Sequence, residues 1–314
     1  MQKFHIGAAV VTKVPELDLD GVEPAFLYPS ADPQSVIERA IQLSAGSYDP
    51  TSRTLRQSIH TWLVQMEGRT ILIDTASGND KDRPTMPLLD HLKEPYLERL
   101  AAAGVDARDV DTVLMTHIHV DHVGWNTRLL DGAWVPTFPN ARYYFSGVEA
   151  DYNAAIDAGD DDAASTLTNG AALGLRSHPP AAGIYTDSIK PVEAAGLAER
   201  IVVDGSEVIP GFSFIGLPGH SIDHAGIVVR SAGEQALFWG DVLHHPVQVA
   251  HPQWNSVFCE FPDTAVIARR RALDLAADSG ATVFTTHFAE SSAGRIERDD
   301  EEGFHWTFAL GEDA

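Results

Sequence analysis

Short hydrophobic runs, each punctuated by Gly or Asp, recur along the whole chain. Runs of this length that are rich in β-branched and aromatic residues are typical of β-strands. The pattern predicts strands at Gly7–Val14, Ser58–Gln65, Thr70–Asp74, Thr112–Thr116, Ala141–Phe145, Arg200–Val203, Phe212–Leu217, Gly226–Arg230, Ala236–Trp239 and Thr282–Thr285.

Helical periodicity is confined to a few segments between these runs. In the first of them, Asp32 suits the N-cap and Pro33 suits the first helical position. We predict helices at Pro33–Leu43, Tyr96–Gly104, Val148–Asp157 and Thr264–Asp278. Because the helices lie between groups of strands, the order favours sheets layered with helices over a simple βαβ alternation.

Composition sets the size of the fold and excludes some partners. A chain of 314 residues with 44% hydrophobic residues forms one large α/β domain or two small ones. Its formal net charge of −23 argues against nucleic acid or an anionic membrane as partner. Cys259 is the one cysteine, so no intrachain disulfide can form. With no long apolar segment either, we expect a cytoplasmic protein.

The strongest chemical signal directly follows the apolar run Val113–Met115. His117, His119, Asp121 and His122 form the pattern H-x-H-x-D-H. For a single His at a strand end, an ordinary surface loop is the better interpretation. Four ligand-type residues together favour a divalent cation, since imidazole and carboxylate suit zinc, iron, manganese or nickel.

Three further strands end in a residue of the same kind: His220, Asp241 and His287. Each alone is a weak signal, but strand ends that share one edge gather functional groups. Gly219 and Gly240 precede two of them and permit turns that other residues resist. Together with the first cluster, these residues suffice for two cations with three protein ligands each and one bridging carboxylate.

Two segments lack clear periodicity. Residues 157–191 are rich in Ala, Gly, Asp and Pro, and a linker between two domains is one interpretation. However, ligand-type residues lie on both sides of the segment and must converge. We therefore predict one domain over residues 1–314, with 157–191 as an insertion or lid. The stretch Glu16–Ser30 also looks irregular and is a candidate to overhang a site.

The order and spacing of these motifs resemble the metallo-β-lactamase-fold hydrolase superfamily over roughly residues 5–295. The matching text is His117-x-His119-x-Asp121-His122, Pro218-Gly219-His220, Gly240-Asp241 and Thr286-His287. The resemblance implies an α/β (α+β) fold, the αββα sandwich, in which two mixed β-sheets are flanked by helices and the metals lie at one edge.

The resemblance also implies a ligand set. His117, His119 and His220 would hold one metal, and Asp121, His122 and His287 would hold the second. Asp241 would bridge two divalent cations, which we expect to be zinc, with Mn, Fe or Co as alternatives. Asp74, at the end of the strand Ile71–Ile73, matches a buried Asp behind the ligands; a turn residue is the other interpretation.

Within the superfamily, the chain is most similar to the group that contains methyl parathion hydrolase and the quorum-quenching lactonases. The supporting text is His122-Val123-Gly124-Trp125-Asn126, Asp241-Val242-Leu243-His244, Pro252-Gln253-Trp254 and Thr286-His287-Phe288. The acyl-homoserine lactonases carry Tyr where this chain has His244, and the parathion-hydrolase type carries His. Asp223 replaces a Gly of the family pattern, while His224 is retained and is interpreted as a structural residue.

The implied activity is hydrolysis of a small apolar ester, lactone or organophosphate by a hydroxide that bridges the metals. Asp121 and Asp241 are the predicted catalytic residues, with Asp121 as a proton shuttle. We predict that the substrate contacts Trp125, His244, Trp254 and Phe288, although aromatic residues more often lie in a core.

Other activities of the same fold stay open. Hydrolytic dehalogenation of an activated aromatic is one, and a non-hydrolytic metal-binding or redox protein with iron is another. Glyoxalase II-like enzymes fit less well, because no set of basic residues for glutathione is visible, and the net charge disfavours the nuclease branches. Relatives of this type often dimerise, which leaves a homodimer open.

Overall fold

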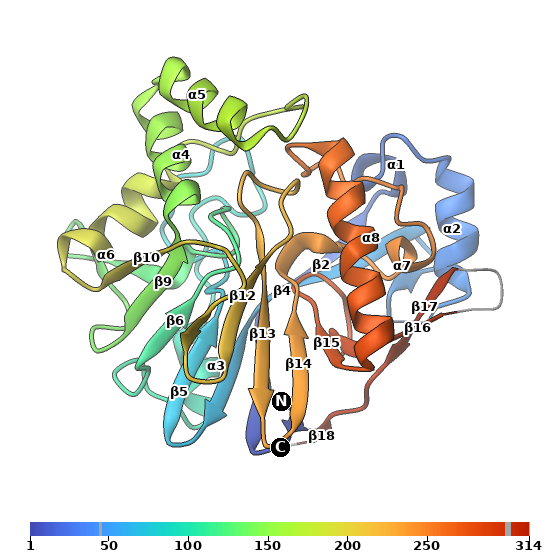
Figure 1. The fold of residues 1–314 in the computed structure, drawn as a ribbon, viewed down its shortest axis with the longest axis horizontal. Coiled ribbons are helices and arrows are strands. Elements are labelled where there is room, and N and C mark those ends of the chain that lie inside the picture. Colours follow the sequence, from blue (N-terminus) through green and yellow to red (C-terminus); the bar gives the residue numbers. More distant parts are fainter. Residues whose placement is uncertain (44–45, 299–302, 314) are drawn as a thin grey trace.

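The predicted strands form two facing β-sheets in the computed structural model, which describes residues 1–43, 46–298 and 303–313 (Figure 1). The first sheet has the order β10-β9-β6-β5-β4-β2-β1-β18, and β3 pairs with β4. Its strands are β1 (Gln2–Ile6), β2 (Ala9–Val22), β3 (Tyr48–Asp49), β4 (Thr54–Met66), β5 (Arg69–Ile73), β6 (Thr112–Leu114), β9 (Arg142–Ser146), β10 (Ala198–Ile201) and β18 (Glu312–Asp313). Strands β5, β6, β9 and β10 are parallel and the others antiparallel, so the sheet is mixed.

The second sheet has the order β11-β12-β13-β14-β15-β16-β17. Its strands are β11 (Glu207–Ile209), β12 (Phe212–Gly216), β13 (Ala225–Ser231), β14 (Glu234–Phe238), β15 (Thr282–Phe284), β16 (Ala293–Arg298) and β17 (Phe304–Phe308). In this sheet β14 and β15 pair in parallel and the other neighbours are antiparallel. A separate hairpin joins β7 (Thr127–Leu130) to β8 (Ala133–Pro136).

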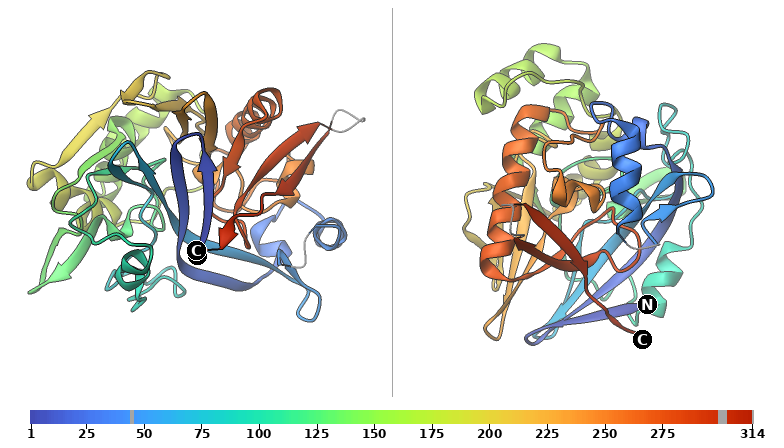
Figure 2. Two further views of the ribbon diagram at one scale, coloured as in Figure 1. Left: turned by 90° about the horizontal axis from the view of Figure 1, so that it is seen from below. Right: turned by 90° about the vertical axis from the view of Figure 1, so that its right-hand side faces the viewer.

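The helices are α1 (Pro24–Leu27), α2 (Pro33–Ile41), α3 (Tyr96–Ala102), α4 (Gly147–Ala158), α5 (Asp161–Ala171), α6 (Lys190–Ala194), α7 (Val247–Ala250) and α8 (Pro262–Ser279). Helices α3, α4 and α6 pack outside the first sheet and α8 packs outside the second, while α5 packs on α4, and α1, α2 and α7 form a separate cluster with Tyr48 and Leu55. Figure 2 shows the long α8, in orange, on the outer side of the second sheet. Within the described residues, no helix is both long and apolar enough to cross a membrane.

Three buried layers hold the sandwich together. Trp62 of the first sheet packs on Phe284 of the second with ring centroids 4.9 Å apart, and Phe284 stacks on Phe238 at 4.6 Å. Outside the first sheet, Leu100 of α3 and Val192 of α6 join one core, while α8 joins another outside the second. Because apolar side chains fill both the inter-sheet space and the space under the helices, the αββα prediction is confirmed.

Each predicted strand and helix overlaps an element of the structure, but β1, β3, β7, β8, β11, β16, β17 and β18 and helices α1, α5, α6 and α7 were not predicted. Strand β2 continues to Val22, so the prediction of an irregular stretch over Glu16–Ser30 is wrong for its first half. Leu17 and Leu19 are partly buried while Asp18 and Asp20 are exposed, the alternation of a strand with one covered face. The segment 157–191 contains α5 and a π-helical turn, Tyr185–Ile189.

A buried cluster of charged side chains, Lys81, Arg83 and Asp187, connects the loop after β5 to this π-helical turn. Lys81 Nζ donates to Thr127 Oγ1 at 2.6 Å and to the Asp187 carbonyl at 3.1 Å, and it lies 3.7 Å above the Trp134 ring. Arg83 forms an ion pair with Asp187 at 2.8 Å. Burial lowers the pKa of Lys81 to about 7, and the Asp187 carboxylate opposes that shift. One carboxylate therefore compensates two buried cationic side chains.

Removing that carboxylate should cost much of the stability of the fold. We expect Asp187→Asn to lower the free energy of unfolding by about 3–5 kcal/mol, because Arg83 would stay charged and buried without that anionic partner and Lys81 would lose the carboxylate that favours its charged form. Urea unfolding followed by Trp fluorescence measures the change. Asp274→Asn, which breaks an exposed pair with Arg298, should leave the midpoint unchanged; equal midpoints for both variants would contradict the assignment.

Candidate metal centre

The ligand-type residues gather where several strands end. His117 to His122 follow β6, His220 lies between β12 and β13, Asp241 follows β14, and His287 follows β15. The turn at Gly240 has a φ of 48°, and a Cβ there would lie 2.5 Å from Thr116 Oγ1. The predicted need for glycine at this turn is therefore steric as well as conformational.

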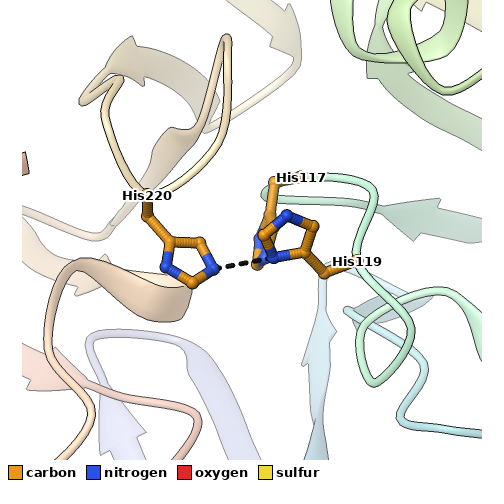
Figure 3. A group of neighbouring side chains, drawn as sticks. All are labelled: His117, His119 and His220. Atoms are coloured by element: carbon orange, nitrogen blue, oxygen red, sulfur yellow. Dashed lines mark hydrogen bonds between the residues drawn. The ribbon is translucent and has the colours of Figure 1, made fainter. Parts of the chain in front are cut away.

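His117, His119 and His220 form the first group of converging side chains (Figure 3). His119 Nδ1 lies 2.8 Å from His220 Nε2, and one ligand atom of each residue lies within 4.8 Å of the others. Three imidazoles at this spacing match the donor set of a divalent cation site.

Asp121, His122 and His287 form the second group, and Asp241 lies between the two groups. Asp241 Oδ1 is 3.1 Å from His122 Nε2. Its Oδ2 is 3.2 Å from His220 Nε2 and 3.0 Å from His287 Nε2. One carboxylate thus contacts imidazoles of both groups, which is the placement expected of a bridging ligand.

The outward nitrogens of four imidazoles are held by other parts of the chain. The contacts are His117 Nδ1 with Thr116 Oγ1 at 3.0 Å, His119 Nε2 with Glu260 Oε1 at 2.8 Å, His122 Nδ1 with Asp74 Oδ2 at 2.9 Å, and His287 Nδ1 with the Ser58 carbonyl at 3.1 Å. These contacts fix the ring orientations and aim the second nitrogen of each ring inward.

The inward atoms fit bound cations. His117 Nε2 is buried without a hydrogen-bond partner in the described part of the chain, and His122 Nε2 and Asp241 Oδ1 form no hydrogen bond there although they lie 3.1 Å apart. Buried polar atoms without partners are costly, and divalent cations would satisfy all three. The donor set contains imidazole and carboxylate but no thiolate, which suits zinc, manganese, iron or cobalt.

The local charges also favour a cation. Burial and neighbouring imidazoles lower the pKa values of His117 and His220, so both rings are neutral and present lone pairs. Burial likewise lowers the pKa of His122, but Asp241, Asp121 and Asp74 outweigh it and raise that pKa well above its ordinary value. Carboxylates that stabilise a proton on His122 would stabilise a metal ion at the same place.

Asp74 lies directly behind the second group. Its Oδ1 accepts from the Thr116 amide at 2.8 Å, and its Oδ2 accepts from Thr116 Oγ1 at 2.8 Å besides contacting His122. Asp74 also has a φ of 54° at the strand end. The two interpretations of this residue are therefore compatible, since the turn directs its carboxylate at the ligand loop.

His224 supports the centre from behind, as interpreted from the sequence. It is buried, and its Nε2 accepts a hydrogen bond from the Asp241 amide at 3.1 Å. This contact fixes the backbone that carries Asp241.

Two buried carboxylates near the centre were missed by the sequence analysis. Glu149 accepts from the Ile118 amide at 3.2 Å and the Asp223 amide at 2.8 Å, and burial raises its pKa to about 7. Glu260 contacts His119, as described above. Neither belongs to a motif; a lone acidic residue inside the apolar stretch Val257–Phe261 was the available signal for Glu260.

A cavity of about 470 Å³ opens directly above the two groups. Its floor is formed by ligand-type residues, and its walls come from β2, α1, β4, the loops after β5 and β6, the segment 178–184 and Phe258. The wall residues are Leu19, Val22, Phe26, Gln57, Ile59, Thr85, Met86, Pro87, Leu88, Leu89, Val120, His178, Pro179, Pro180, Ala181, Ile184 and Phe258. None of the described lining residues is Lys or Arg.

Of the four residues predicted to contact substrate, His244 lines the cavity and the other three do not. His244 lines the cavity and stacks on His287 with ring centroids 5.5 Å apart. Trp125 instead stacks on Tyr96 and donates to Glu16 Oε1 at 2.6 Å. This contact places the indole in the core rather than at the cavity.

Trp254 and Phe288 also lie away from the cavity lining. Trp254 stacks on His251, and Phe288 is fully buried against Trp306 at 5.0 Å. The interpretation of Trp125, Trp254 and Phe288 as substrate contacts is corrected by this placement. Side chains next to ligand loops point into the adjoining cores because those cores are where their apolar area is buried.

Known proteins resemble the whole arrangement. Residues 55–287 match the model of the family described as the Metallo-beta-lactamase superfamily. The ribonuclease Z of Mycobacterium avium (strain 104) is 26% identical over 271 residues, covering 76% of this chain and 88% of that protein.

Two solved structures share the fold over nearly their full length. Hydrolase AbOPH in the beta lactamase superfamily has a TM-score of 0.78 at 24% identity, covering 99% of this chain and 98% of that one. AidC, a dizinc quorum-quenching lactonase, has a TM-score of 0.72 at 20% identity with the same coverage, 99% and 98%.

Replacing the central carboxylate should empty the centre. We expect Asp241→Asn to weaken metal binding by more than the roughly 10–100-fold that removal of a residue behind a ligand causes. The metal content of purified protein after dialysis against a weak chelator measures the effect. Asp204→Asn, in an exposed turn, is the control; an Asp241 variant that retains two metals would disprove the bridging role.

Proposed function

The chain belongs to the metallo-β-lactamase superfamily of hydrolases, and we propose that it is a two-metal hydrolase of small, neutral, apolar esters, lactones or organophosphates. The residues His117, His119 and His220 would hold one cation, and Asp121, His122 and His287 the other, with Asp241 between them. We propose zinc as the metal, since the imidazole and carboxylate donors suit it.

The cavity is the observation that carries the proposed substrate class. Its walls are mostly Leu, Ile, Val, Met, Pro and Phe side chains, and its floor is the metal centre. A volume of about 470 Å³ suits a small molecule. Burial of apolar substrate area against these walls would supply the binding free energy, at about 25 cal/mol per Å².

The same cavity disfavours RNA, the substrate that the name of the ribonuclease Z relative implies. RNA and glutathione conjugates carry anionic groups that require cationic partners. None of the described residues along the cavity is Lys or Arg, and the chain has a formal net charge of −23. A neutral substrate avoids the cost of bringing an unpaired anion into an apolar pocket.

The residues at the cavity floor would have different roles in hydrolysis. When bound, the two cations would activate a water molecule and polarise the substrate carbonyl or phosphoryl oxygen. Asp121 lines the cavity, with 17% of its side chain exposed, and can pass a proton to the leaving group. Asp241 lies deeper and holds three imidazoles in place.

His244 is the proposed contact for a substrate oxygen. Both of its ring nitrogens are buried without a hydrogen-bond partner among the described residues. Nε2 lies 3.4 Å from Asp241 Oδ2, so the ring faces the metal centre. The lactonase likeness is supported by the fold shared with AidC, whereas the likeness to methyl parathion hydrolase depends on His at this position.

A substrate panel tests the proposed class. We expect turnover of aryl esters, lactones and neutral phosphotriesters, with kcat/KM rising about fourfold for each buried methylene, which corresponds to about 0.8 kcal/mol. The panel should also contain a glutathione thioester, a short RNA and a chlorinated nitrile-bearing aromatic. Preferred turnover of the RNA or thioester would refute the proposal, and halide release alone would favour dehalogenation.

Truncating the cavity rim should affect long substrates selectively. Phe26 lines the cavity although 56% of it is exposed, and its ring packs on Phe258 at 5.8 Å. We expect Phe26→Ala to raise KM several-fold for long-chain substrates and to leave short ones unchanged. Ile267→Ala, which removes an apolar side chain of α8 that is 68% exposed and does not line the cavity, is the control; equal KM changes for all chain lengths would contradict the prediction.

A further inference from the structure

Glu260 is fully buried and contacts both loops that carry the first ligand group. Its Oε1 lies 2.8 Å from His119 Nε2, and its backbone amide donates to the His220 carbonyl at 3.0 Å. The neighbouring Phe261 amide donates to the Gly219 carbonyl at 2.8 Å. His119 and His220 therefore depend on one short segment for their relative position.

The same residue is also joined to the wall of the cavity. The Ser177 amide donates to the Glu260 carbonyl at 2.7 Å, and Ser177 Oγ donates to the Cys259 carbonyl at 2.8 Å. His178 Nε2 lies 2.9 Å from the Val257 carbonyl. These contacts attach residues 177–178 to the Glu260 segment, immediately before Pro179, Pro180 and Ala181, which line the cavity.

A hydrogen-bond chain stabilises the second carboxylate oxygen. Tyr152 Oη donates to Glu260 Oε2 at 2.9 Å, and Arg176 donates to Tyr152 Oη at 2.9 Å. The Arg176 guanidinium also lies 5.9 Å from the centre of the Tyr152 ring. The buried carboxylate thus has a partner at each oxygen, and its charge is linked to a cationic side chain next to the cavity wall.

The orientation of His119 explains why this chain of contacts matters. Its Nδ1 faces His220 and the first group, so the proton of a neutral ring belongs on Nε2, where Glu260 accepts it. A carboxylate at that place fixes the tautomer and increases the basicity of the ligating nitrogen. Without it, the His119 ring would be free to turn its lone pair away from the cation.

We propose that Glu260 is a positioning residue that holds His119 for cation binding, and that Tyr152 and Arg176 couple this role to the cavity wall at residues 176–181. The inference rests on the proposed metal centre but not on any particular substrate. It predicts that the strength of metal binding at the first group depends on side chains that contact no metal.

Metal retention of matched variants tests the proposal. Each protein is loaded with Zn²⁺ or Co²⁺, and the loss of each cation to a competing chelator is followed by metal analysis and by the Co²⁺ absorption spectrum. We expect Glu260→Gln to lower the affinity for one of the two cations by about 10–100-fold and to change the Co²⁺ spectrum. Tyr152→Phe removes one hydroxyl. It and Arg176→Ala should each lower the affinity for the same cation by a smaller factor.

The double variant and a control identify the route of the effect. Tyr152→Phe in the Glu260→Gln background should cause no further loss, because Tyr152 acts through Glu260. Glu193→Gln and Tyr185→Phe disrupt a hydrogen bond of the same kind, 2.7 Å long, that does not involve the centre, and they should retain both cations. Thermal unfolding of the metal-free variants separates a folding defect from a binding defect.

Two results would overturn the inference. One is a Glu260→Gln protein that keeps both cations and the wild-type Co²⁺ spectrum, and the other is a further loss in the double variant. A wild-type protein that binds no cation after loading would instead overturn the metal centre itself, so the two failures are distinguishable.

Discussion

The convergence of buried, unpartnered lone pairs is the constraint around which this structure is built. Several imidazole nitrogens and one carboxylate oxygen point into a small volume without a hydrogen-bond partner in the described chain. Such a volume is unfavourable without cations, so the rest of the fold must hold the rings against their tendency to turn away. The outward contacts of His117, His119, His122 and His287 provide that resistance.

The sandwich supplies rigid origins for these rings. Each ligand follows a strand whose backbone is fixed by its neighbours, and the aromatic contact between Trp62 and Phe284 locks the two sheets to each other. Ligands from one sheet therefore meet ligands from the other at a spacing set by the inter-sheet core.

The sequence predicted the layered fold and the seven ligand-type residues that form the two groups and the carboxylate between them, for identifiable reasons. H-x-H-x-D-H is local, and His220, Asp241 and His287 each follow an apolar strand. Glu260 and Glu149 were not predicted because their roles arise from long-range contacts. Glu260, for example, contacts His119, which is 141 positions away in the chain.

The sequence also did not show in which direction individual side chains point. Trp125 and Phe288 flank ligands in the chain but point into cores, and nothing local distinguishes that direction from the cavity. The strand over Leu17 and Leu19 was missed because its alternation is short and is followed by turn-forming residues.

The absence of cationic side chains along the described cavity wall has a consequence for turnover. Hydrolysis of a neutral ester, lactone or triester generates an acid that ionises at neutral pH. Under the proposed function, the apolar walls that would take up the uncharged reactant would offer that anion no partner, and the acidic surface would repel it. Apart from the centre itself, the pocket would therefore promote departure of the product, which limits inhibition by accumulated acid.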